Sequence, residues 1–336
     1  MTRPAKLVLL VLLLGVTIAA AFLWGERQSQ PAARVFQFEY TTRIPAVPAG
    51  TAKLRVWIPV PVSDSEQEIS QLTIESPVPY LLHEDPEYHN HYAFLELDPR
   101  VLAAPLEVRM RFQALRREHR VALAPSAGAA EATPAELARF LQPDHLVPID
   151  GMIAALAEQQ TRGLTRPLDK ARAIYNYVIS TMRYEKTGQG WGRGDAIYAC
   201  TVRKGNCSDF HALFIGMMRA AGIPARFEIG FPLPADQHSG DLPGYHCWAQ
   251  FYLEGVGWVP VDASEAWKHP DRRDYFFGAH DQNRVLFSRG RDIRFNPAQR
   301  GEPLNYFIYP YAEVDGKPLT GIEYRFSFRD LESKNP

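Results

Sequence analysis

The stretch that decides the fold is residues 205–211, with the sequence Gly-Asn-Cys-Ser-Asp-Phe-His. Asn206 is of a residue type favoured at the N-cap of a helix, so a helix is predicted to begin at Cys207. It is expected to continue to Ala221, because Gly222 follows and can end it. A cysteine at a helix start gains thiolate character from the partial positive charge there. Its backbone N–H, which has no acceptor inside the helix, can also face a developing oxyanion.

Two later residues complete the pattern of a thiol active site. His246 lies in an aromatic strand pattern over residues 245–253, and Asp262 closes the next strand pattern. A helix-borne thiol, an imidazole on the sheet and a carboxylate that holds the other ring nitrogen are the nucleophile, base and orienter of covalent acyl transfer. The sequence therefore predicts Cys207, His246 and Asp262 as the catalytic residues.

The hairpin between these two strands does not bring its two catalytic residues directly opposite each other in the simplest register. Residues paired across a hairpin have a constant sum of residue numbers, so pairing His246 with Asp262 requires a turn centred on Glu254. Two glycines instead centre the predicted turn near Val256. A bulge or an earlier turn is therefore expected, for which Pro260 is a plausible place because proline cannot donate a ladder hydrogen bond.

The rest of the chain predicts an α+β fold in two domains. Alternating apolar and polar residues, clearest over 106–112, indicate an antiparallel β-sandwich-like domain over 32–123. A capping-box helix start opens the second domain, 133–330, in which helices precede an antiparallel sheet. Two further strands of this second domain are expected at 306–314 and 322–328.

Four linked motifs carry a family resemblance. They are Gly-Asn-Cys-Ser-Asp-Phe-His at 205–211, Gly-Ile-Pro-Ala-Arg at 222–226, Tyr-His-Cys-Trp-Ala at 245–249 and Gly-Trp-Val-Pro-Val-Asp at 257–262. In this order they resemble the bacterial transglutaminase-like family of the papain-like fold, over about residues 165–265.

The resemblance implies a cysteine-bearing helix packed on an antiparallel sheet and a thioester acyl-enzyme formed from a peptide or glutamine-type carboxamide. It maps the family's cysteine, histidine and aspartate onto Cys207, His246 and Asp262. Trp191 is the candidate for the upstream indole that such enzymes direct at the oxyanion.

Other residues near the motifs leave alternatives open. His211 could be a rival base, but a neighbour on the same helix points along it, which favours packing or a supporting hydrogen bond. Cys200 and Cys247 could pair as a disulfide, since three cysteines leave at least one thiol free. Zinc binding is disfavoured because strand alternation turns Cys247 away from His246. No metal or cofactor is predicted.

Several charged residues also have competing interpretations. Asp209 and Glu265 are alternative orienters, although Asp209 is better explained as an acid that stabilises the first helical turn. Arg284, Arg289 and Arg291 could bind an anionic substrate group, but a solvated basic face is the favoured interpretation.

The first 27 residues predict a signal peptide or an N-terminal membrane anchor. Arg3 and Lys6 precede an uncharged run over residues 7–24, and this run is near the minimum length of a membrane span. The remainder is expected to be exported, either periplasmic or anchored to the inner membrane facing the periplasm. The 37 basic residues nearly balance the 38 acidic ones, which argues against a nucleic-acid partner.

Together these features predict a thiol acyl-transfer enzyme that acts on peptide or protein substrates, including cell-envelope peptides. Hydrolysis is the preferred outcome, because an exported domain is surrounded by water. The alternatives are a protein-glutamine transglutaminase that forms crosslinks and a non-catalytic envelope-binding module on the same fold.

Overall fold

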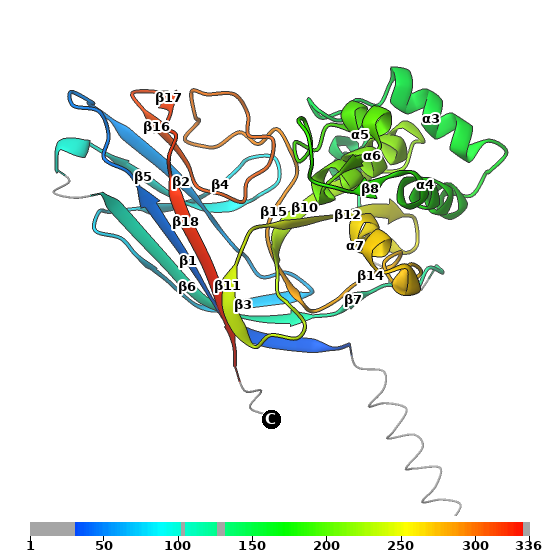
Figure 1. Cartoon of the computed structure of the whole chain (residues 1–336), viewed down its shortest axis with the longest axis horizontal. Coiled ribbons are helices and arrows are strands. Elements are labelled where there is room, and N and C mark those ends of the chain that lie inside the picture. Colours follow the sequence, from blue (N-terminus) through cyan, green and yellow to red (C-terminus); the bar gives the residue numbers. More distant parts are fainter. Residues whose placement is uncertain (1–30, 102–104, 126–131, 332–336) are drawn as a thin grey trace, which may run out of the picture. The chain divides into compact units, whose positions relative to one another are not determined.

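The computed structural model describes residues 31–101, 105–125 and 132–331 (Figure 1). The apolar run 7–24, expected to be a signal or an anchor, lies outside these ranges. Within them, no helix combines the length and hydrophobicity needed to cross a membrane. The architecture below is that of the compact unit beginning at Ala33.

Two five-stranded antiparallel sheets form the β-rich part. The first has the order β11 (Ser239–Leu242), β18 (Glu323–Asp330), β1 (Ala33–Ile44), β6 (Leu106–Arg117) and β3 (Gln67–Glu75). The second has the order β17 (Lys317–Pro318), β16 (Tyr311–Val314), β2 (Leu54–Val60), β5 (His91–Leu97) and β4 (Leu81–Glu84). Strand alternation turns Phe36, Phe38 and Tyr40 of β1 into the core, as predicted for an amphipathic strand.

The C-terminal strands belong to these same sheets. The sequence assigns the strands near 306–314 and 322–328 to the second domain, but β16 pairs with β2, and β18 pairs with β1 over eight registered residues. These pairings fill sheet edges that would otherwise expose backbone hydrogen-bonding groups. The β-rich part is therefore built from both ends of the chain.

The middle of the chain forms a four-stranded antiparallel sheet with helices packed on it. Its order is β13 (Gly257–Val261), β12 (His246–Leu253), β10 (Ala225–Pro232) and β15 (Arg284–Arg289). The helices are α2 (Pro134–Ala138), α3 (Gly151–Thr161), α4 (Pro167–Thr181), α5 (Ala196–Val202), α6 (Cys207–Ala220) and α7 (Ala263–Lys268). Two short pairs complete the fold, β8 (Arg183–Tyr184) with β9 (Lys204–Gly205) and β7 (His119–Arg120) with β14 (Ala279–His280).

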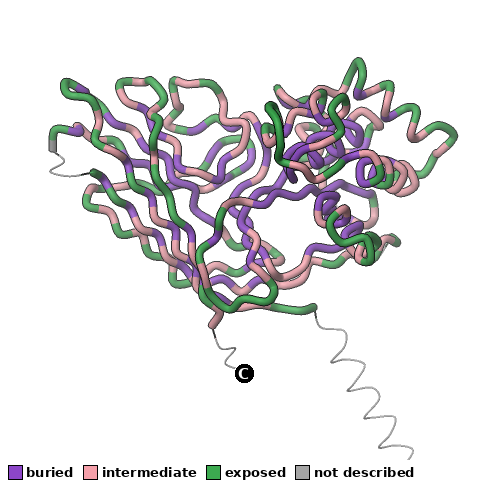
Figure 2. The backbone as a smooth tube through the Cα atoms, in the orientation of Figure 1, coloured by how far each residue is buried: buried purple, intermediate pink, exposed green. Residues whose placement is uncertain are grey.

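Helix α6 lies at the centre of this α+β arrangement. All its residues from Cys207 to Arg219 are buried, as is every residue of β12 (Figure 2). Phe231 of β10 also packs against Phe38 of β1, with ring centroids 5.3 Å apart. The four-stranded sheet thus shares its core with the β-rich part, and the buried helix α6 packs against this sheet.

Candidate active site

Cys207 is the first residue of α6, as the sequence predicts. The Asn206 side chain caps the helix by accepting the Ser208 N–H at 2.9 Å, and Asp209 reciprocates by accepting the Asn206 N–H at 2.9 Å. A side chain at Gly205 would not fit, because its Cβ would lie 2.1 Å from Asp209 Oδ2. The motif therefore builds a capped helix start at which the thiol is 2% exposed.

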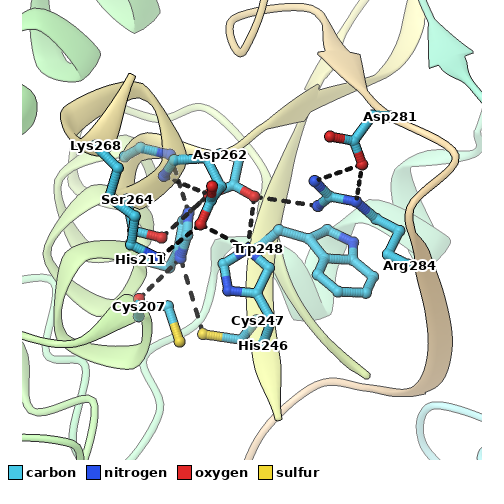
Figure 3. Close-up of polar contacts among 12 residues, drawn as sticks. Cys207, His211, His246, Cys247, Trp248, Asp262, Ser264, Lys268, Asp281 and Arg284 are labelled. Atoms are coloured by element: carbon cyan, nitrogen blue, oxygen red, sulfur yellow. Dashed lines mark hydrogen bonds and ion pairs between the residues drawn. The ribbon is translucent and has the colours of Figure 1, made fainter. Parts of the chain in front are cut away.

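His246 and Asp262 meet beside this helix start. His246 Nε2 lies 2.7 Å from Asp262 Oδ2, and both residues are buried. This leaves the other ring nitrogen, Nδ1, on the side of Cys207 (Figure 3). The three predicted residues are thus brought together, with the imidazole between the thiol and the carboxylate.

The hairpin reaches this geometry without a bulge, through a turn centred on Gly255, one residue earlier than Val256. Strands β12 and β13 pair in one continuous register, from Ala249 with Val261 to Leu253 with Gly257. Extended by one residue, that register places Asp262 opposite Trp248, which shares a face with His246. Asp262 is therefore a diagonal neighbour of His246, within reach of a long side chain. Direct opposition of His246 and Asp262, which the expectation of a bulge or an earlier turn assumed, is not needed.

Asp262 is also the N-cap of α7. Its Oδ1 accepts the Glu265 N–H at 3.0 Å and the Ser264 hydroxyl at 3.1 Å. Its Oδ2 accepts the Arg284 guanidinium at 3.1 Å in addition to His246. The alternative orienter Glu265 lies 4.0 Å from His246 Nε2 and is engaged by Lys268 at 2.7 Å. The closer, fully buried Asp262 holds the ring.

The charges in the site favour an ion pair. Burial disfavours a charged His246, but the Asp262 carboxylate and Cys207 outweigh it and raise the pKa of His246 to about 10. Burial likewise opposes a thiolate, yet Cys247 and His246 together hold the pKa of Cys207 well below its ordinary value. The pKa of Asp262 also falls well below its usual range, because His246 and Arg284 outweigh its burial. This arrangement suits a thiolate nucleophile beside an imidazolium.

Known proteins resemble this chain in sequence and in fold. Residues 154–263 match the model of the transglutaminase-like superfamily. The chain carries a transglutaminase-like core. It is 28% identical over 344 aligned positions to an uncharacterized protein of Haemophilus influenzae, covering 90% of this chain and 92% of that one. It is 25% identical over 147 positions to YebA, an uncharacterized protein of Bacillus subtilis, covering 39% of this chain and 20% of YebA.

A solved structure shares the fold over most of its length. It is that of a proposed cysteine protease from Cytophaga hutchinsonii, with a TM-score of 0.59 and 16% identity over 91% of this chain and 94% of that one. The fold is therefore α+β, with a papain-like transglutaminase core beside a sheet-rich part to which both ends of the chain contribute. The superfamily match indicates a cysteine-dependent enzyme in the broad sense.

His211 ties two parts of the transglutaminase-like core together. Its Nδ1 lies 2.8 Å from the Cys207 carbonyl, to which it donates, and its Nε2 accepts the Ala263 N–H at 3.1 Å. Burial lowers the pKa of His211, so the ring stays neutral in this bridging role. The expected supporting hydrogen bond is confirmed, since both ring nitrogens are already used by the backbone.

Cys247 lies nearer to Cys207 than the sequence suggests. As predicted, it faces away from Trp248 and Gln250, which both bond Glu228 on the opposite side of β12. It therefore faces α6, with its sulfur 3.6 Å from Ser208 Oγ, and Cys247 helps to hold the pKa of the Cys207 thiol below its ordinary value (Figure 3). Cys200 and Cys247 are both free thiols, so the possible disulfide between them does not form.

The segment containing Trp191 is held against the start of α6. The N–H groups of Gly192 and Gly194 donate to the Asp209 carboxylate at 2.7 and 3.0 Å. Arg291 donates to the Gly194 carbonyl at 2.6 Å. Asp209 therefore anchors a loop as well as capping the helix, a role that the sequence pattern did not reveal.

The interpretation of three arginines as a solvated basic face is wrong. Arg284 and Arg291 are 2% and 1% exposed, and Arg289 forms ion pairs with Glu228 and Asp64 at 2.8 and 2.6 Å. Each guanidinium is committed to an internal partner of the protein. These arginines differ from surface residues only in having buried partners that are distant in sequence. The local sequence pattern therefore gave the wrong prediction of a solvated face.

Within the described residues, no three histidine, cysteine or acidic side chains are grouped as they would be around a metal ion.

Proposed function

We propose that this protein is a thiol acyl-transfer enzyme that cleaves a peptide or carboxamide bond through Cys207, His246 and Asp262. The observation that carries the proposal is the 2.7 Å bond between His246 Nε2 and Asp262 Oδ2. With this nitrogen occupied, only Nδ1 is left to exchange a proton with the thiol at the helix start.

The reaction follows from this arrangement. The Cys207 thiolate attacks the substrate carbonyl carbon, and the carbon–nitrogen bond then breaks as His246 gives its proton to the leaving amine or ammonia. A thioester on Cys207 results. In the second half, His246 removes a proton from water as the water attacks the thioester, which releases a carboxylic acid and restores the imidazolium–thiolate pair.

Two donors are proposed for the oxyanion that forms in each half. The backbone N–H of Cys207 has no acceptor within its own helix because it is the first helical residue. The resemblance to transglutaminase-like enzymes adds the Trp191 indole. Its loop is bonded through Gly192 and Gly194 to the carboxylate of Asp209, two residues from the nucleophile.

Hydrolysis is proposed as the main outcome, with amine transfer as the alternative. Cys207 is 2% exposed and His246 is 5% exposed, so the second acceptor must reach a thioester between nearly buried residues. Water is the smallest such acceptor. We further propose that the substrates are peptides or proteins, including cell-envelope peptides. The enzyme would encounter them after its export or while it is anchored through residues 7–24. Fractionation of cells that produce the tagged full chain tests this location.

The activity is tested with a panel of glutamine-containing and branched peptides incubated with a fluorescent primary amine. Mass spectrometry distinguishes hydrolysed acid from amine adduct, and Cys207→Ala is the matched control. We expect mainly acid, which the control does not form. A dominant adduct would instead indicate crosslinking activity. Products that persist in Cys207→Ala would contradict the assigned nucleophile.

A further inference from the structure

Arg284 is a buried cation that shares an oxygen atom with the proposed base. It is the first residue of β15 and is 2% exposed. Its NH1 donates to Asp262 Oδ2 at 3.1 Å, the same atom that lies 2.7 Å from His246 Nε2. Its Nε and NH2 lie 3.4 Å from Asp281 Oδ1, and its guanidinium lies 4.8 Å from the Trp248 ring centre (Figure 3).

The two oxygens of Asp262 have separate tasks. Oδ1 accepts the Ser264 hydroxyl and the Glu265 N–H, which fix the carboxylate at the start of α7. Oδ2 is left for the two charged groups. Because the helix cap already holds the carboxylate in place, Arg284 is not required merely to position it. The distinctive effect of Arg284 is electrostatic.

We propose that Arg284 is a positioning residue that acts through Asp262 to lower the proton affinity of the His246 ring. A cation beside the shared oxygen withdraws part of the negative charge that would otherwise stabilise the imidazolium, and the cation itself repels it. His246 must surrender the proton on Nδ1, the nitrogen on the side of Cys207, to the leaving nitrogen when the carbon–nitrogen bond breaks. The inference rests on the proposed function and adds to it a residue that sets the proton affinity of the base.

The other charged groups around His246 do not duplicate this effect. Glu265 reaches only 4.0 Å from Nε2 and is paired with Lys268, and His211 is neutral. Burial keeps the His280 ring neutral as well, by lowering its pKa well below the ordinary value. The titratable or charged groups facing His246 and Arg284 from the surrounding elements are Cys207 and His211 of α6, Cys247 of β12, Tyr184 of β8, Asp262 and Glu265 at α7, Arg116 of β6, His280 of β14, and Asp281.

The test follows the titration of the His246 ring by histidine-selective NMR, with the resonance assigned from the spectrum of His246→Ala. Arg284→Gln removes the charge while keeping a donor, and Arg284→Lys keeps the charge. Arg289→Met is the matched control, since Arg289 lies on the same strand and its ion pairs are with Glu228 and Asp64. Should Arg284→Gln fail to fold, Arg284→Met is a second charge-free variant, with an unbranched apolar side chain beside Trp248.

In the charge-free variant the His246 midpoint should rise by about one pH unit, a roughly tenfold gain in proton affinity. Arg284→Lys and Arg289→Met should stay near the wild-type value. An unchanged or lowered midpoint in the charge-free variants would overturn the inference, because a purely structural role gives no upward shift. The outcomes are separable: a wild-type His246 that titrates like a free histidine would refute the proposed function itself.

Discussion

Replacing Asp209 with alanine would remove the carboxylate that joins the nucleophile's helix to the Trp191 loop. Its oxygens accept the N–H groups of Gly192, Gly194 and Asn206 at 2.7, 3.0 and 2.9 Å. A buried donor left without a partner costs about 1–3 kcal/mol. Gly192 is partly exposed, so water can replace its bond, while the other two donors are buried. The expected loss of unfolding free energy is therefore about 2–6 kcal/mol.

Asp209→Asn should be milder. Burial raises the pKa of Asp209 despite its three N–H donors, so the site tolerates a neutral group. The amide oxygen can keep two of the bonds, which leaves a loss of about 1–3 kcal/mol. Asp195→Ala, which removes the cap of α5, is the control at about 1 kcal/mol. Urea unfolding of the full chain measures all three. A loss for Asp209→Ala no larger than that of the control would refute this reasoning.

Three further predictions concern the site. His211→Ala should destabilise the protein by about 3–5 kcal/mol in urea titrations, because it opens a cavity and leaves two backbone groups unpaired. It should not move the pH midpoint of Cys207 alkylation. A shift of that midpoint as large as the shift in His246→Ala would identify His211 as a base. Cys247→Ala removes the thiol that helps to lower the pKa of Cys207 and should raise that midpoint by about one unit; an unchanged midpoint would show that Cys247 does not stabilise the thiolate. Because the pKa of His246 is about 10 when folded and about 6.5 when unfolded, its contribution to stability is complete below about pH 6.5 and is lost as the pH rises toward 10. Unfolding free energies should therefore fall more steeply over this range in the wild type than in His246→Ala, and parallel curves would disprove the linkage.

Local sequence signals predicted the start of the site closely. Asn206 and Gly222 gave a helix from Cys207 to Ala221, and the structure has Cys207–Ala220. Capping and glycine termination act within a few residues, so a single sequence contains the information needed. The side of the sheet to which the Cys247 side chain points likewise follows from the two-residue alternation of a strand alone.

Features that depend on distant partners were not predictable in the same way. The C-terminal strand Glu323–Asp330 pairs with β1 across nearly the whole chain, and no local pattern encodes that choice. Arg284 and Arg291 are buried because they meet Asp262 and the Gly194 carbonyl, which the sequence places 22 and 97 residues away. The diagonal contact of His246 with Asp262 could have been found, because strand parity already placed both on one face.

The most direct test of the central claim is the pH dependence of Cys207 alkylation by iodoacetamide, with mass spectrometry identifying the modified thiol. The 2% exposure of Cys207 lowers the absolute rate but not the midpoint. We predict a midpoint well below the value of about 8.5 for a free cysteine, which moves up toward that value in His246→Ala. A wild-type midpoint at or above the free-thiol value, or one unaffected by His246→Ala, would contradict the imidazolium–thiolate pair on which the account rests.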